Sequence, residues 1–316
     1  MPVAGVLALG AIYLVWGSTY LAIRIAVREG AGWGPFWMGA CRVSVAAAVL
    51  FAVNRLRGVR LRPSKAELWV LAASGGLLWV GGNGGVNWAE QHVASGLAAL
   101  IIGSMPIWVA IMEALLDRRP PSARLAAALL TGFAGLAVLT WPLLRHGVTA
   151  DVAGVVVLLG GTLCWGGGSI LLRRRPVSLD PVVSSGWQQL VGSLGFAALA
   201  LATAEPAPSP TLHAWLAWSY LVVFGSLLAF TCFVLAVKLL PTTLVMTYAY
   251  VNPVIAVVLG WLILSEPITL YTVVGTALIL AGVVGVFADK RERPTTVGPA
   301  SATAAAIRGS CRDQEG

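Results

Sequence analysis

The feature that most constrains this chain is a series of apolar runs, each about 20 residues long, separated by short polar breaks. A bilayer core of about 30 Å needs roughly 20 apolar residues of α-helix. The runs are apolar on every side, which argues against a transmembrane β-barrel, whose strands are about half as long and alternate strictly. We therefore expect an all-α membrane protein with ten transmembrane helices, approximately Val3–Val27, Pro35–Val53, Glu67–Trp88, Val93–Leu116, Ala123–Leu144, Val152–Leu172, Pro181–Thr203, Ala214–Val237, Thr243–Leu264 and Leu270–Ala288.

The composition supports a membrane environment. Hydrophobic residues make up 58% of the 316 residues and charged residues only 11%, whereas a soluble domain carries about 25% charged residues. The net charge of +8 does not indicate nucleic acid, because the basic residues stand in short clusters between the apolar runs. The four cysteines lack C-x-x-C spacing, so we expect neither a metal site nor a disulfide framework, and no cofactor.

Lysine and arginine alternate between successive loops. They gather after the second, fourth, sixth and eighth predicted helices and at the start of the tail, in clusters that begin at Arg55, Arg118, Arg173, Lys238 and Lys290. The other loops hold only Arg28 and Arg145. Because basic loops stay in the cytoplasm, we expect both termini to be cytoplasmic in the cell (inner) membrane. The polar stretch 289–316 is expected to be a disordered cytoplasmic tail.

The two halves of the chain repeat each other. At a nearly constant offset, Trp16-Gly17 aligns with Trp165-Gly166, Pro106 with Pro253, and Gly135 with Gly282. We expect residues 3–144 and 152–288 to be two five-helix repeats. Because five is odd, the second repeat must enter the membrane from the opposite side. Such inverted repeats are typical of secondary transporters, which open to either side around a site near the midplane.

An ordered set of motifs resembles a known family. Residues 16–24 (WGSTYLAIR) resemble the first helix of the EamA branch of the drug/metabolite transporter superfamily, and Arg42 fits an arginine in its second helix. Residues 87–96 resemble the connection between its third and fourth helices. Two further matches are Trp187-Gln188-Gln189 in the seventh helix and Ser265-Glu266-Pro267 in the turn after the ninth.

The resemblance covers residues 3–288 and implies a fold and an activity. It implies ten helices around a central cavity lined by the first, third, fourth, sixth, eighth and ninth. It also implies outward movement of metabolites, amino acids or drugs. The chain departs from the family at Asp117-Arg118-Arg119, where the first repeat usually has a Gly-Glu turn, and this puts in doubt an acidic pair shared by both halves.

Polar and aromatic residues at membrane depth are the candidate substrate contacts. Trp16, Tyr20 and Arg24 are spaced by four and share one helix face. They could form an aromatic wall with a cation for an anionic substrate group, or Arg24 could snorkel to the outer interface. Asn83 and Asn87 also share a face, and either contact substrate or bond neighbouring helices.

Four further candidates lie in the second half: Trp165, Gln188, Tyr248 and Asn252. Pro106 and Pro253 each remove a backbone hydrogen bond within a predicted helix, which produces either a packing kink or a broken helix beside a binding site. Arg42 has three interpretations: snorkelling outward, pairing with a carbonyl of another helix, or direct contact with substrate.

We expect a secondary transporter that exports a small metabolite, amino acid or drug by alternating access. The sequence leaves open whether a proton gradient or the solute's own gradient drives it. The alternative is an intramembrane enzyme acting on a lipid or peptide, but its motifs are absent and the three histidines fall at or beyond predicted helix ends. We therefore expect a protein that is not an enzyme. Its expected partners are a small-molecule substrate and the bilayer, with a homodimer left open.

Overall fold

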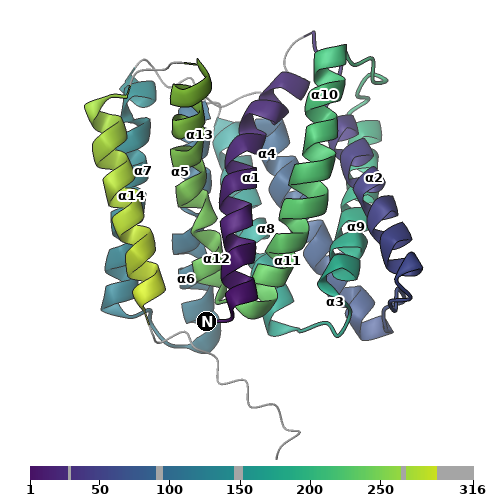
Figure 1. Cartoon of the computed structure of the whole chain (residues 1–316), viewed down its shortest axis with the longest axis horizontal. Coiled ribbons are helices and arrows are strands. Elements are labelled where there is room, and N and C mark those ends of the chain that lie inside the picture. Colours follow the sequence, from purple (N-terminus) through teal and green to yellow (C-terminus); the bar gives the residue numbers. More distant parts are fainter. Residues whose placement is uncertain (28–29, 90–94, 146–151, 265–267, 290–316) are drawn as a thin grey trace, which may run out of the picture.

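The computed structural model describes residues 1–27, 30–89, 95–145, 152–264 and 268–289, and this part is helical, without strands (Figure 1). Stretches 90–94 and 265–267, which hold parts of two family-like motifs, and most of the expected tail lie outside the described residues. The elements of the first half are α1 (Val3–Val27), α2 (Pro35–Leu56), α3 (Lys65–Gly75), η1 (Gly76–Asn83), α4 (Gly84–Ala89), α5 (Ser95–Gly103), α6 (Met105–Asp117) and α7 (Ala123–Arg145).

The second half follows a similar order. Its elements are α8 (Val152–Arg174), α9 (Pro181–Ala202), α10 (Leu212–Tyr220), η2 (Leu221–Ala229), α11 (Phe230–Leu239), α12 (Thr242–Met246), α13 (Tyr248–Leu264) and α14 (Leu270–Ala288). The segments η1 and η2 are π-helical, and each lies between two α-helices in a continuous run. The third and eighth predicted helices therefore change their winding midway.

The described chain is a multi-pass membrane protein by the length and composition of its helices. Seven stretches are long and apolar enough to cross a bilayer: Pro35–Leu56, Leu97–Asp117, Ala123–Pro142, Val152–Arg174, Leu212–Leu239, Thr242–Leu259 and Leu270–Ala288. The two prolines singled out in the sequence differ in their effect. Pro106 stands in the first turn of α6, where its missing N–H is tolerated, whereas Pro253 lies inside α13.

Helix starts are encoded by local capping residues and by one remote carboxylate. Ser64 and Glu67 form a capping box at α3, and the Asp180 side chain accepts from the backbone N–H of Val182 at α9. The start of α2 is capped from the α9–α10 connection. There the Glu205 carboxylate accepts from the backbone nitrogens of Phe36 and Trp37, at 3.0 and 2.7 Å. This contact ties the two halves together.

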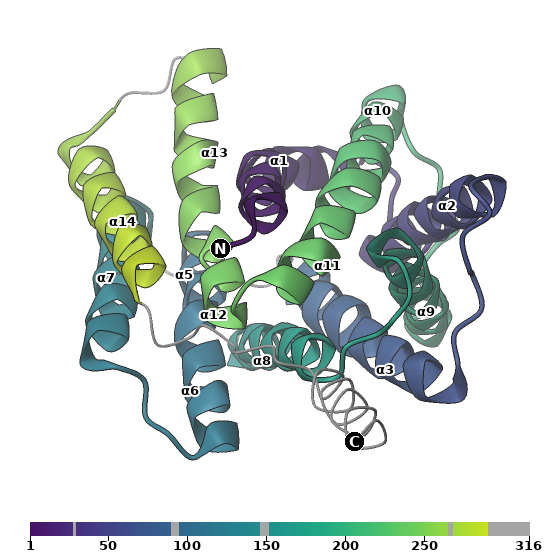
Figure 2. The same ribbon diagram turned by 60° about the horizontal axis from the view of Figure 1, so that its bottom comes forward.

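Helices of the first half pack mainly on helices of the second. The pairs α7–α14 and α2–α9 form the two flanks of the bundle (Figure 2). Between them, α1 packs on α10, η2, α11 and α13, while α8 packs on α3, η1, α4, α5 and α6. The flanks therefore enclose a central group of helices drawn from both halves.

Glycines bring the backbones of α7 and α14 into direct contact. A Cβ atom at Gly135 would lie 2.6 Å from the backbone nitrogen of Ile279, and one at Gly282 would lie 2.5 Å from that of Gly132. Lipid provides no hydrophobic drive between helices, so close approach of small residues is a main source of their association.

We predict that Gly282→Ala lowers the free energy of unfolding by about 1–3 kcal/mol, because the new methyl group must displace backbone atoms of α7. The measurement is SDS denaturation of the purified protein in mixed micelles. Gly160→Ala is the matched control, because Gly160 is exposed on α8 and a Cβ there meets nothing within 4 Å. Equal effects of the two substitutions would contradict the assignment.

Candidate functional site

A cavity of about 90 Å³ lies deep in the central group of helices. It borders Trp16 near the middle of α1 and Trp165 near the middle of α8. The described residues that line it are Trp16, Thr19, Ile23, Arg42, Trp79, Gly82, Asn83, Val86, Asn87, Ile102, Met105, Gly161, Thr162, Trp165, Tyr248 and Asn252. We call this space the central cavity.

The central cavity gathers six of the nine substrate contacts predicted from the sequence: Trp16, Asn83, Asn87, Trp165, Tyr248 and Asn252. Gln188 is not among its lining residues. It is fully buried on α9, where its amide nitrogen donates to the Ser74 hydroxyl at 2.7 Å. The side chains of Tyr20 and Arg24 lie outside what the structure describes.

Aromatic rings form a cluster along one wall of the central cavity. The ring of Trp16 meets that of Trp165 edge to face at 5.7 Å between centroids, and that of Tyr248 at 4.8 Å. Fully buried Phe233 packs on the rings of Trp16, Trp165 and Tyr248. Edge-to-face pairs fix ring orientation, so this wall is a shaped surface.

Arg42 does not snorkel outward. Its side chain is buried, with 5% exposed, and its Nε donates to the Ser226 hydroxyl of η2 at 2.7 Å. Its guanidinium carbon lies 5.8 Å from the centroid of the Trp79 ring, within cation–π range. The partner is thus a side-chain hydroxyl rather than the carbonyl that the sequence suggested, and neither Trp79 nor Ser226 was expected at the site.

The π-helical segment η2 makes room for Arg42. A Cβ at Gly225 would lie 2.7 Å from an Arg42 terminal nitrogen, so a larger residue there would require the guanidinium to shift. The Gly225 carbonyl also accepts from the indole nitrogen of Trp16 at 3.3 Å. π-Helical turns often occur at functional sites, and here one turn positions both a cation and an aromatic wall residue.

Several polar atoms around the central cavity have no hydrogen-bond partner. They are buried, and they are the indole nitrogens of Trp79 and Trp165 and the side-chain oxygen of Asn252. By contrast, Asn87 donates to the Pro35 carbonyl at 3.5 Å, which joins α4 to α2. Buried polar groups are normally satisfied, so unpaired donors and an unpaired acceptor at one cavity are groups that a ligand could satisfy.

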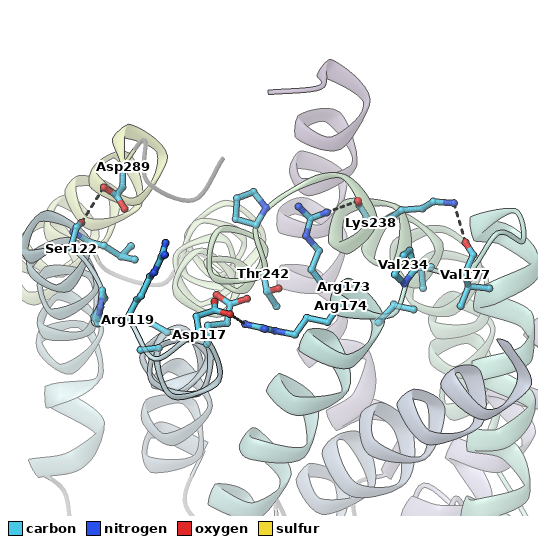
Figure 3. Close-up of a pocket in the computed structure, with 18 of the residues that line it drawn as sticks. Asp117, Arg119, Ser122, Arg173, Arg174, Val177, Val234, Lys238, Thr242 and Asp289 are labelled. Carbon is cyan, nitrogen blue, oxygen red and sulfur yellow. Dashed lines mark hydrogen bonds and ion pairs between the residues drawn. The ribbon is translucent and has the colours of Figure 1, made fainter. Parts of the chain in front are cut away.

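A second and larger cavity, of about 1120 Å³, lies among the ends of α6, α8 and α11 (Figure 3), at the end of the bundle that holds the N-terminus (Figure 1). We call it the basal cavity. Among its lining residues, Arg174 pairs with Asp117 at 2.7 Å, and Arg173 donates to the Lys238 carbonyl at 2.6 Å. At its inner edge the Glu113 carboxylate accepts from the Thr243 hydroxyl at 3.0 Å, which joins α6 to α12.

The two cavities are stacked along the same helices. On α6, Met105 lines the central cavity and Ala110 lines the basal cavity. On α8, Trp165 lines the central cavity and Leu172 lines the basal cavity. These separations of five and seven residues correspond to roughly 8–10 Å along a helix. Phe233 packs on the aromatic wall, and the next residue, Val234, lines the basal cavity. The aromatic cluster therefore lies between the two spaces.

Metal-binding potential is low in the part of the chain that the structure describes. No group of three or more His, Cys, Asp and Glu side chains is close enough there to hold an ion. The described side chains of the central cavity present aromatic faces, amide groups and one buried guanidinium.

Several known proteins similar to this chain are named as transporters. It is 31% identical to the uncharacterized inner membrane transporter YedA of Escherichia coli over 261 residues, which is 82% of each chain. It is 23% identical to the uncharacterized transporter YoaV of Bacillus subtilis, over 86% of this chain and 92% of that one. A crystal structure with a TM-score of 0.75 covers 89% of this chain and 95% of the other at 21% identity, which supports the fold alone.

A family model gives the assignment. The model of the EamA-like transporter family matches residues 3–141 and matches again over residues 152–288. These matches cover most of the chain and agree with the family that the motifs of the sequence resemble. The chain belongs to the EamA-like transporter family.

Proposed function

We propose that this protein is a secondary transporter that binds a small solute in the central cavity and exports it by alternating access. The observation that carries the proposal is the central cavity itself. It is a space at the middle of the helices, with an aromatic wall and, on its lining residues, unpaired polar atoms. Binding sites of this kind are typical of carriers built from repeats. Six of the predicted contacts, with Arg42 and Trp79, are the proposed substrate-binding residues.

We further propose ten crossings arranged as two inverted five-helix repeats, residues 3–144 and 152–288. The reciprocal contacts at α7–α14 support this arrangement. A Cβ at Gly135 would meet Gly275 and Ile279, while one at the aligned Gly282 would meet Ala128 and Gly132. In addition, η1 and η2 occupy corresponding places in the two halves, each within the third helix of its repeat.

The end of the bundle that holds the N-terminus is proposed to be cytoplasmic. Basic residues stand at the ends of α2, α6, α8 and α11 there, including Arg55, Arg118, Arg174 and Lys238 (Figure 1). Basic segments remain on the cytoplasmic side. The basal cavity is then the entrance for solute, and the aromatic cluster is the barrier that must open before solute reaches the central cavity.

Two polar contacts join the helices that must separate when this barrier opens. The Asp117–Arg174 pair links α6 to α8, and the Glu113–Thr243 bond links α6 to α12. The ion pair is substantially exposed, so it contributes little to the balance between states. The Glu113–Thr243 bond is partly buried and lies nearer the barrier, so its loss should bias the protein toward the state open to the cytoplasm.

An intramembrane enzyme is the second candidate, and no contact in the central cavity favours it. A hydrolase would need a nucleophile with a base within hydrogen-bond reach. Of the three histidines, only His213 lies in the described part, and it is exposed at the start of α10. The test below therefore measures flux and hydrolysis with the same preparation.

We predict that the protein in proteoliposomes moves at least one member of a panel of small metabolites, and that Trp165→Leu lowers the initial rate about tenfold or more. Loss of an indole at the site removes both ring contact and a donor. Trp261→Leu is the matched control, because Trp261 is 49% exposed on α13, where lipid is expected. No flux together with saturable hydrolysis of a lipid or peptide would overturn the proposal, and equal losses in both variants would make Trp165 structural.

We predict that Thr243→Val raises maleimide labelling of a cysteine placed at Thr162, applied from the cytoplasmic side, by about fivefold, since one hydrogen bond is worth about 1 kcal/mol. The background carries serine at the four native cysteines. Thr131→Val is the control, because the Thr131 hydroxyl bonds only within its own helix, to the Ala127 carbonyl at 2.8 Å. Unchanged labelling in Thr243→Val would show that the Glu113–Thr243 bond does not hold the barrier.

A further inference from the structure

Arg42 is a buried cation without a described acidic partner. Of its five N–H donors, the contact to Ser226 uses one. The ion pairs among the described residues join Arg60 with Glu67 and Arg174 with Asp117. Neither pair includes Arg42. A guanidinium stays charged in a protein, and a buried charge without a counter-charge is strongly destabilising. The remaining donors of Arg42 are therefore available to an anion from outside the described residues.

Other residues that line the central cavity with Arg42 define the ligand further. The indole nitrogens of Trp79 and Trp165 are two more buried donors without partners, and the cavity carries one buried acceptor without a partner, the side-chain oxygen of Asn252. One cation and two neutral donors suit a group with several acceptor oxygens. The Asn252 oxygen suits a hydroxyl or N–H group elsewhere on the same ligand.

The remaining lining residues and the volume of the cavity limit the size and polarity of the ligand. Apolar side chains, including Ile23, Val86 and Ile102, complete the lining with the aromatic rings. The volume of about 90 Å³ is well below the roughly 300–1,000 Å³ of sites for drug-sized molecules. A compact apolar body fits this space.

We propose that Arg42 binds the carboxylate of a compact substrate, with the Asn252 oxygen accepting from a hydroxyl or N–H group of the same molecule. The inference rests on the proposed transport function and narrows its substrate class. A planar carboxylate can accept two parallel bonds from one guanidinium. A cationic substrate is the competing class, since aromatic cages bind ammonium groups. However, no acidic side chain lines the described part of the cavity to balance a second cation beside Arg42.

The test compares acids with their own amides on the purified full-length protein. The probes are lactate, phenylacetate and mandelate, the three matching amides, benzylphosphonate and phenethylamine, and the readout is quenching of tryptophan fluorescence. We expect at least one acid to bind about tenfold or more tightly than its amide, which is the size of one charged hydrogen bond. Mandelate should bind more tightly than phenylacetate, because its hydroxyl can donate to Asn252.

Variants assign the discrimination to Arg42. In Arg42→Gln the ratio of acid to amide affinity should fall to about one, and Arg42→Lys should keep part of it, because the charge remains but the paired donors are lost. Trp79→Phe keeps a ring and removes one donor, so it should weaken acids more than amides. If the Arg42 variants do not fold, Trp79→Phe and the comparison of acid and amide affinities in the wild-type protein test the carboxylate assignment. Trp261→Leu is the control, and its ratio should be unchanged.

Each contrary outcome has a distinct meaning. Equal binding of acids and amides, preference for the amine, or no response to any acid overturns the carboxylate assignment. Preference for benzylphosphonate over every carboxylate overturns it in favour of a tetrahedral anion. Flux of neutral or cationic solutes alone, measured in proteoliposomes, leaves the transport function in place and removes only this inference. Absence of flux for every solute removes the transport function instead.

Discussion

Hydrocarbon offers no hydrogen-bond partner, so a polar group inside this bundle is costly unless the protein or a ligand supplies one. One turn of η2 supplies three such partners. The Ser226 hydroxyl accepts from Arg42, the Ser226 carbonyl accepts from Gln189 at 3.2 Å, and the Gly225 carbonyl accepts from Trp16. These side chains come from α2, α9 and α1. This one turn of η2 therefore joins α1, α2 and α9 beside the central cavity.

The π-helical segments explain how so many large side chains reach one place. Widening a helix by one residue per turn exposes carbonyls that an α-helix would use internally. Glycines then keep the surface open. A Cβ at Gly82 of η1 would lie 2.9 Å from the ring of Trp165, just as one at Gly225 would collide with Arg42. Each segment thus admits a bulky residue from a neighbouring helix into the wall of the central cavity.

The flanks and the central group have different packing. On the flanks, α7 and α14 touch through backbone atoms at glycines, which allows little relative movement. The central helices meet through aromatic rings and single hydrogen bonds, such as Glu113 to Thr243, which can be exchanged at small cost. A firm frame around exchangeable contacts is what alternation between two open states requires.

Apolar length, loop charge and the internal repeat were readable from the sequence because hydrophobic transfer and charge placement act on each segment separately. The helical nature of the chain and most helix bounds followed from apolar length, and the family followed from an ordered set of motifs. Several residues of the central cavity, among them Trp16, Asn87 and Trp165, were predicted from their spacing within the apolar runs and from the repeat. Gln188 is not among the lining residues of the central cavity, and helical periodicity could not show this, because it assigns a face but does not say what packs against it.

Only the tertiary structure decided which faces meet. The partnership of Arg42 with Ser226 and Trp79 joins residues far apart in sequence, and no local pattern encodes it. The winding change in η1 and η2 was equally hidden, because apolar periodicity in the sequence does not distinguish a π-helical turn from an α-helical one. The sequence determined that this chain enters a membrane as apolar helices in two related halves. The reason is that the free energy of transferring a segment from water into the bilayer depends on the composition of that segment alone. The site required the assembled bundle, because the pairing of buried polar groups is a property of helices in contact.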